Sequence, residues 1–170
     1  MVPGQGGRPE RTVARTQAPA RREARHVVGR AAHLGPGAPV VAVVLVTGAG
    51  RGLGAAIAAR LAADGARVGL LDRDEEQLAR VAAEVPGGVP LGADILDEAE
   101  VEAALDRLEA AAGPDGSVTG VVNNAGVVRF GPLLELAQGD FRAVTDVNLV
   151  GTFTVARAAA RRMAGAGTGG

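Results

Sequence analysis

Hydrophobic and polar positions over residues 40–170 alternate between short aliphatic runs and stretches with helical spacing. The first run, residues 40–46, is continuously aliphatic, which is typical of a strand buried on both faces of a sheet. It is followed by Leu53, Ile57 and Leu61, which recur at the spacing of one helix face. The regular part of the chain is therefore predicted to open with a strand, a tight turn and a helix.

This pattern repeats along the chain. Further strands are predicted at three apolar runs, residues 67–71, 89–93 and 118–122. Asp74 and Asp97 are predicted N-caps of the helices that lie between these strands. A long helix is expected from about Asp140 to Met163. Strands that alternate with helices predict an α/β fold with a parallel sheet and right-handed crossovers.

Residues 1–39 have a different composition and are predicted to be a disordered extension. They contain six Gly and five Pro but only five residues from the set Leu, Ile, Val and Phe. This is too little apolar surface to offset the loss of chain entropy on folding. Seven Arg against two acids in this segment could bind nucleic acid. The composition favours an unselected extension instead, and a nucleic-acid partner is not expected.

The residue inventory excludes several kinds of site. The chain has no Cys, so disulfides, thiolate metal sites and cysteine nucleophiles are ruled out, and no metal site is predicted. No apolar run approaches the roughly 18 residues that a membrane span needs. The start of the chain lacks the apolar core of a secretory signal. A cytoplasmic protein with no membrane partner is therefore expected.

A glycine-rich run, residues 47–54, comes directly after the first predicted strand. Glycine allows a tight turn and a close approach of the backbone to a pyrophosphate, and the N-terminus of the next helix attracts that anion. A strand before the run and a helix after it form the setting of a dinucleotide-binding fingerprint, although a turn that needs glycine only for its geometry is the alternative. The predicted cofactor-binding residues here are Gly48, Arg51, Gly52, Leu53 and Gly54.

Asp72 ends the second predicted strand, 18 residues after Gly54. This is near the spacing at which an acid hydrogen-bonds the adenosine ribose hydroxyls. A carboxylate there favours NAD because it repels the 2′-phosphate of NADP, whereas Arg51 and Arg73 would attract that phosphate. NAD is therefore preferred over NADP as the predicted cofactor. The alternative role for Asp72 is a helix cap shared with Asp74.

These motifs resemble those of the short-chain dehydrogenase/reductase family. The glycine run matches the family pattern TGxxxGxG, and Asn-Asn-Ala-Gly at residues 123–126 matches the family's NNAG. Asp94-Ile95 and Asn148 match two further family positions, and the likeness runs from Val40 to the C-terminus. The resemblance implies a Rossmann-like doubly wound parallel sheet with strand order 3-2-1-4. It also implies a sheet truncated after the fourth strand and the following long helix.

The resemblance also implies roles for these residues. Asp94 and Ile95 would contact adenine, and Asn123, Ala125 and Gly126 would line the nicotinamide-ribose side of the site. Asn148 would bend its helix and hold a water in the proton relay. Its spacing places it on the apolar face of that helix, where a buried amide needs partners, so a core Asn without a chemical role is the alternative. The apolar residues of that face are Phe141, Val144 and Val155.

The family pattern stops before its catalytic residues. Family members transfer hydride between nicotinamide and a small alcohol or carbonyl, using Ser, Tyr and Lys. This chain has no Tyr and no Lys, and its one Ser, Ser117, opens the fourth predicted strand. We therefore expect weak dinucleotide binding, no activity of the chain alone, and homo-oligomers through the long helix, as in the family. The alternatives are a non-catalytic nucleotide-binding or partner-dependent module and, less favoured by the motifs, a methyltransferase.

Overall fold

The computed structural model describes residues 41–114 and 116–168, and a four-stranded parallel sheet forms its centre. The strands lie in the order β3-β2-β1-β4, which confirms the expected order. β1 pairs with β2 along its whole length, with Val43 opposite Arg67. The strand bounds are β1 Val43–Thr47, β2 Arg67–Asp72, β3 Val89–Gly92 and β4 Gly120–Val122.

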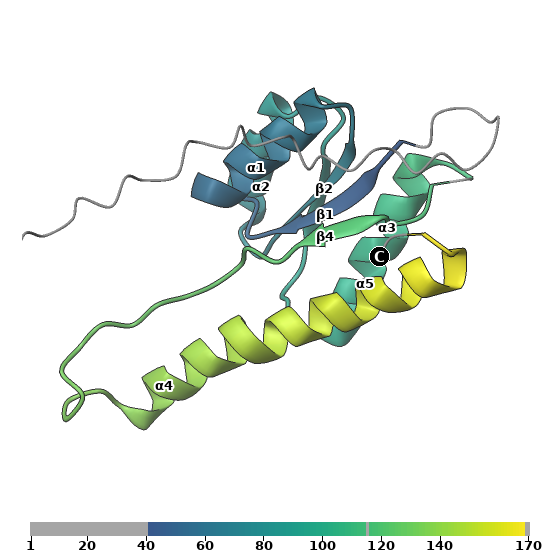
Figure 1. The fold of residues 1–170 in the computed structure, drawn as a ribbon. Helices are drawn as coiled ribbons and strands as arrows, with labels where there is room; N and C mark the ends of the chain where they lie inside the picture. Colours follow the sequence, from purple (N-terminus) through teal and green to yellow (C-terminus); the bar gives the residue numbers. More distant parts are fainter. Residues whose placement is uncertain (1–40, 115, 169–170) are drawn as a thin grey trace, which may run out of the picture.

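Helices cover both faces of the sheet (Figure 1). α1 (Gly52–Ala63) and α2 (Glu75–Glu84) lie on one face, where Val46 packs into a cluster with Leu78. α3 (Glu98–Ala112) and α5 (Thr152–Ala166) lie on the other, where Leu45 shares a cluster with side chains of both helices. Because its strands are buried on both faces, the sheet has the layered doubly wound arrangement that the strand pattern predicted.

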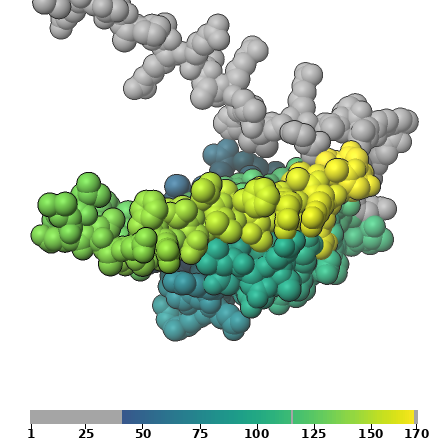
Figure 2. Space-filling model, turned by 90° about the horizontal axis from the view of Figure 1, so that it is seen from below, coloured from purple at the N-terminus to yellow at the C-terminus, as the bar shows by residue number. Residues whose placement is uncertain are grey.

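The long C-terminal helix is interrupted by a π-helical turn. α4 (Gln138–Thr145) continues into the π-helix η1 (Asp146–Gly151), which leads directly into α5. Figure 2 shows the α4 end of this helical rod projecting beyond the body of the molecule. The predicted long helix, from about Asp140 to Met163, is therefore present but runs from Gln138 to Ala166 and contains a π-helical turn that was not predicted. Among the described helices, none is long and apolar enough to cross a membrane.

The strand ends also differ from the prediction. β1 begins at Val43 rather than at Val40, because Val41 precedes the start of both neighbouring strands and is 55% exposed. β4 begins at Gly120 rather than at Val118, because the Thr119 hydroxyl takes the place of a backbone acceptor for the Val43 N–H. The segment predicted to be disordered, residues 1–39, lies outside the described residues, as does Val40.

Arg162 on α5 joins that helix to α3. Its guanidinium contacts the carboxylates of Glu102, Asp106 and Glu109, each at 2.7 Å. Burial alone would lower the pKa of Arg162, but hydrogen bonds to these three carboxylates outweigh it and raise the pKa further above its already high value. α5 is therefore held against α3 by these ion pairs as well as by apolar packing.

Candidate functional site

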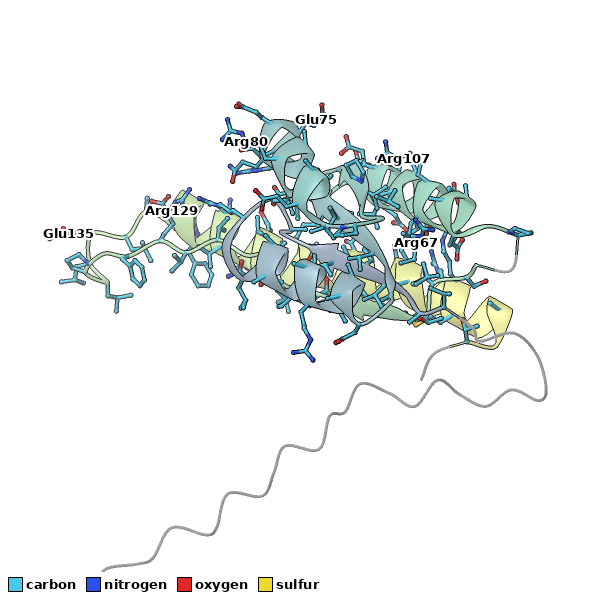
Figure 3. All side chains as sticks on the ribbon, turned by 90° about the horizontal axis from the view of Figure 1, so that it is seen from above. Arg67, Glu75, Arg80, Arg107, Arg129 and Glu135 are labelled. Carbon is cyan, nitrogen blue, oxygen red and sulfur yellow. The ribbon has the colours of Figure 1, made fainter. Side chains whose placement is uncertain are left out.

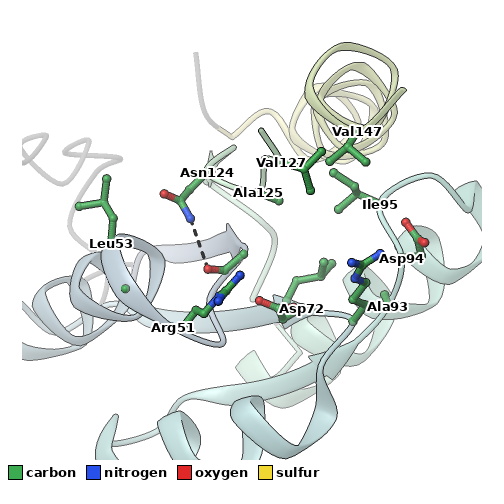
Figure 4. A pocket seen from close by; sticks show the side chains of 15 residues that line it. Arg51, Leu53, Asp72, Ala93, Asp94, Ile95, Asn124, Ala125, Val127 and Val147 are labelled. Carbon is green, nitrogen blue, oxygen red and sulfur yellow. Dashed lines mark hydrogen bonds between the residues drawn. The ribbon is translucent and has the colours of Figure 1, made fainter. Parts of the chain in front are cut away.

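A cavity of about 360 Å³ opens at the carboxyl ends of the strands (Figure 4). Ligands bind in this position in open α/β sheets. The glycine loop and β2 form one side, and residues that follow β4, together with η1, form the other. The cavity is lined by Gly48, Arg51, Gly52, Leu53, Leu71, Asp72, Arg73, Ala93, Asp94, Ile95, Asn124, Ala125, Gly126, Val127 and Val147.

The glycine loop turns the chain from β1 into α1. Gly48 and Gly52 adopt φ values of +65° and +56°, in the left-handed region that favours glycine. Gly54 is buried in the first turn of α1, where an added Cβ would lie 2.1 Å from the Gly48 carbonyl oxygen. Arg51, the N-cap of α1, makes no side-chain capping hydrogen bond. The first N–H groups of α1 therefore lack a side-chain cap beside the cavity, as an anion site requires.

Thr47 and Asn124 hold the glycine loop against the segment that follows β4. The buried Thr47 hydroxyl accepts the backbone N–H groups of Asn124 and Ala125, each at 3.0 Å. In return, Asn124 Nδ2 donates to the carbonyl oxygens of Thr47 at 3.0 Å and of Gly48 at 3.3 Å. Figure 4 shows the second of these bonds at the edge of the cavity. These bonds fix the backbone of two cavity walls relative to each other.

Asp72 reaches from the end of β2 to the glycine loop. Its Oδ2 accepts the Gly50 N–H at 3.0 Å and its Oδ1 accepts the Asp74 N–H at 3.2 Å. The guanidinium-bearing residues Arg51 and Arg73 line the same end of the cavity. The carboxylate that favours NAD and the two guanidinium groups that favour NADP therefore lie at the same end of the cavity.

Asp74, not Asp72, caps α2. Its Oδ1 accepts the Gln77 N–H at 3.0 Å, which confirms the predicted N-cap. The backbone N–H and the side-chain amide of Gln77 lower the pKa of Asp74, and Arg51 adds a smaller effect of the same sign. Asp72 accepts the N–H of Gly50 and that of Asp74, the residue before the helix, but no N–H from within α2, so its carboxylate is not the cap.

The turn after β3 places Asp94 and Ile95 in the cavity wall. Asp94 Oδ1 accepts the Leu96 N–H at 2.9 Å, and the Asp94 N–H donates to Glu100 Oε2 at 2.7 Å. Ile95 is buried against η1, where a Cβ added to Gly151 would lie 2.6 Å from Ile95 Cδ1. The turn is thus held by hydrogen bonds to Asp94 and by the packing of Ile95 on Gly151. The adenine contact expected of these residues stays a prediction.

Asn148 lies behind the cavity wall, within η1. Its Oδ1 accepts the Val127 N–H at 2.8 Å and its Nδ2 donates to the Val127 carbonyl at 2.9 Å. Asn148 is exposed and Phe141 is 63% exposed, whereas Val155 is buried, so the expected burial was wrong for Asn148 and Phe141 and right for Val155. Bonding of the i→i+5 type changes which side chains share a face of the helix, and the α4 end projects beyond the body of the molecule. Asn148 does find the partners that an amide needs.

The structure places most of the predicted cofactor-binding residues along one cavity, with two exceptions. Asn123 points away from it and donates to the Thr152 carbonyl at 3.5 Å, because side chains alternate in direction along an extended segment. Gly54 lies behind the loop and acts through its close packing. The prediction did not include Asn124, although Asn124 forms part of the same Asn-Asn-Ala-Gly motif. Its direction depends on the twist at the end of β4, which residue spacing does not encode.

Apolar wall residues were also missed. Leu71 and Ala93 stand at strand ends, and Val127 and Val147 close the side opposite Asp72. Aliphatic residues of this kind are common in any core, so no signal in the sequence sets them apart.

Comparison with known proteins agrees with this arrangement. Residues 42–170 match the family model described as short chain dehydrogenase. The chain is 41% identical over 131 residues to D-threitol dehydrogenase of Mycolicibacterium smegmatis, covering 75% of this chain and 49% of that protein. It is 38% identical over 130 residues to galactitol 2-dehydrogenase of Cereibacter sphaeroides, covering 75% of this chain and 50% of that protein.

Solved structures are similar over the same region. NAD⁺-bound xylitol dehydrogenase superimposes with a TM-score of 0.71 at 32% identity, covering 75% of this chain and 50% of that one. A short chain dehydrogenase from Burkholderia cenocepacia in complex with NADP gives 0.64 at 38% identity, covering 71% and 50%. The chain spans about half the length of the curated relatives that it matches. Fold, motifs and relatives together show that this chain belongs to the short-chain dehydrogenase family.

Proposed function

We propose that this chain is the cofactor-binding part of an NAD(P)-dependent oxidoreductase that transfers hydride between the nicotinamide and a small alcohol or carbonyl compound. The observation that carries the proposal is the single cavity that joins the glycine loop, Asp72 and the Asn-Ala-Gly segment at the strand ends. Glycine backbone beside a helix N-terminus suits a pyrophosphate, and a carboxylate suits a ribose diol. The names of the relatives D-threitol dehydrogenase and galactitol 2-dehydrogenase favour a polyol as the alcohol.

Of the residues expected to take part in proton transfer, this chain contains Asn148 but no Tyr and no Lys. Asn148 would position the cavity wall through Val127, and it is the one predicted participant in proton transfer that this chain contains. These 170 residues therefore do not supply the Tyr hydroxyl that exchanges a proton with the substrate in the resembled family, nor the Lys that assists it. A nucleotide-binding module without catalysis would use the same cavity and differ only in that respect.

NAD is the proposed cofactor, and Asp72 carries the preference. Its carboxylate lines the cavity at the end of β2, the position from which an acid bonds the adenosine ribose in folds of this type, and it would repel a 2′-phosphate. We expect the Asp72→Ala variant to bind NADH about tenfold more weakly, because ribose hydrogen bonds to a charged acceptor are lost. NADPH should bind more tightly than before, because Arg51 and Arg73 remain.

Saturation-transfer difference NMR suits this test, since it detects weakly bound ligands. The measured quantity is the ratio of the NADPH to the NADH dissociation constant in each variant. Asp64→Ala is the control, because Asp64 pairs with Arg60 on the surface and does not line the cavity. Absence of any NADH or NADPH signal in the parent chain would refute the proposed function. Equal affinities in the parent would refute the proposed NAD preference.

We also propose that copies of this chain associate through the helical rod α4-η1-α5. Phe141, Leu149 and Phe153 along this rod are each more than half exposed, which is unusual for large apolar side chains. Figure 3 labels Arg129 and Glu135, two charged residues of the segment that precedes α4, near the projecting end of the rod. Members of the family are commonly oligomeric, and an apolar helix face is a suitable contact.

Light scattering after size exclusion should give a mass above the 16.9 kDa of one chain. A Leu149→Asp, Phe153→Asp variant should weaken association by at least about tenfold, because charges in an interface are costly to desolvate. Val41→Asp is the control. It places a charge on a residue that is also more than half exposed but lies just before β1, outside the helical rod, and it should leave the mass unchanged. A parent chain that elutes as a single monomer would argue against this contact.

A further inference from the structure

The Asp72 carboxylate is held by two backbone N–H groups before any ligand arrives. One oxygen accepts the Gly50 N–H and the other accepts the Asp74 N–H. A carboxylate has about four lone-pair directions, so each oxygen keeps capacity for a further donor. These bonds fix the rotamer of Asp72 and leave its remaining lone pairs available beside the cavity.

Gly50 makes room for this carboxylate. A Cβ added at Gly50 would lie 2.9 Å from Asp72 Oδ2, 3.1 Å from Asp72 Cγ and 3.2 Å from Gln77 Cβ. Real Cβ atoms do not approach an oxygen this closely, so the carboxylate would have to move. Gly50 is not among the glycines with positive φ. Its backbone is therefore accessible to any residue, and the need for glycine at this position comes from the side chain of Asp72.

Two arginines stand beside Asp72 and would act once the carboxylate moved. Arg51 and Arg73 line the same cavity, and a guanidinium pairs readily with a phosphate. With the carboxylate held against the loop, the site suits a ribose with two free hydroxyls. With the carboxylate displaced, the remaining charge at this end of the cavity suits a ribose 2′-phosphate.

We propose that Gly50 is a specificity-determining position: by holding the Asp72 carboxylate against the glycine loop, it sets the choice between NAD and NADP. This inference rests on the proposed function of the cavity. Gly50 acts here as a positioning residue, since it affects the choice of cofactor only through the position of the Asp72 carboxylate.

The test compares Gly50→Ala with the parent chain in the same NMR titration. The backbone N–H is kept, so the variant changes the space available to Asp72 and, less closely, to Gln77 Cβ. We expect the ratio of the NADPH to the NADH dissociation constant to fall about tenfold, as expected when one charge-assisted hydrogen bond is lost and a repulsion is relieved. Gly139→Ala is the matched control, because a Cβ at Gly139 meets no atom within 4 Å.

A double-mutant cycle separates this mechanism from general damage to the loop. If Gly50 acts through Asp72, adding Gly50→Ala to Asp72→Ala should leave the ratio unchanged. A ratio that falls again in the double variant, or equal weakening of both cofactors in Gly50→Ala, would overturn the inference. Failure of the parent chain to bind either cofactor would instead overturn the proposed function.

A second variant covers the case in which Gly50→Ala does not fold. Asp72→Glu leaves the loop untouched but moves the carboxylate one methylene beyond the position where the Gly50 N–H holds it. The ratio should fall about threefold or more, which is less than in Gly50→Ala because the charge remains nearby. A ratio equal to that of the parent chain would show that the position of the carboxylate does not affect the choice of cofactor, and would overturn the inference.

Discussion

The Gly54→Ala variant is expected to lose at least about 2–3 kcal/mol of stability and most of its dinucleotide affinity. A Cβ at Gly54 would lie 2.1 Å from the Gly48 carbonyl oxygen and 2.7 Å from Asn124 Nδ2. The first neighbour is backbone, which cannot turn aside as a flexible side chain can. Of the described glycines, none would bring an added Cβ closer to a neighbouring atom than this.

The loop cannot retreat from the new methyl group, because it is packed on its other side as well. Gly48 lies so close to Ala125 that its own added Cβ would be 2.9 Å from the Ala125 Cα. Movement of Gly48 would also break the 3.3 Å hydrogen bond from Asn124 Nδ2. The methyl group therefore displaces the backbone that forms the proposed pyrophosphate site, and binding falls together with stability.

Thermal unfolding followed by circular dichroism measures the first effect, and the NADH titration measures the second. A loss of 2–3 kcal/mol should lower the melting temperature by roughly 5–12 °C for a domain of this size. Gly139→Ala lies in an open first turn of α4 and should be neutral or slightly stabilising. A melting temperature within about 2 °C of the parent chain would contradict the packing argument.

The sheet could be predicted from the sequence because its information is local. Aliphatic runs such as residues 67–71 alternate with helices whose caps, Asp74 and Asp97, accept the backbone N–H groups expected of them. Once this alternation is known, the right-handed crossover restricts how the strands can be ordered. Because the glycine loop directly follows β1, it must then lie at the carboxyl edge of the sheet, where the cavity opens.

The second half of the site was harder to predict because it depends on contacts between distant segments. Asn148 was expected to bend its helix and hold a water, but its amide bonds Val127, 21 residues away, from within a π-turn. Asn123 and Asn124 are adjacent and chemically identical, and only the second faces the glycine loop. Nothing local distinguishes two such residues. Their roles depend on how β4 twists beside β1.

The contacts of Thr47 lead to the other large expected effect. Thr47 is 1% exposed, and its hydroxyl accepts the N–H groups of Asn124 and Ala125. Thr47→Val keeps the shape of the side chain and removes this acceptor. Two part-buried N–H groups would then lack a partner, at about 1–3 kcal/mol each, so stability should fall by about 2–4 kcal/mol. NADH binding should weaken as well, because Ala125 forms part of the cavity wall.

Two further variants show whether the hydroxyl itself is responsible. Thr47→Ser keeps the hydroxyl and should recover most of the lost stability and binding. Thr154→Val removes a hydroxyl from another buried threonine, which only supplements the helical carbonyl of Val150, so the change should stay within about 1 kcal/mol. Urea unfolding of the four chains gives the free energies directly. If Thr47→Val and Thr154→Val lose equal stability, the hydroxyl of Thr47 does not join the two walls of the cavity, and the glycine loop must be held in place by the Asn124 amide alone.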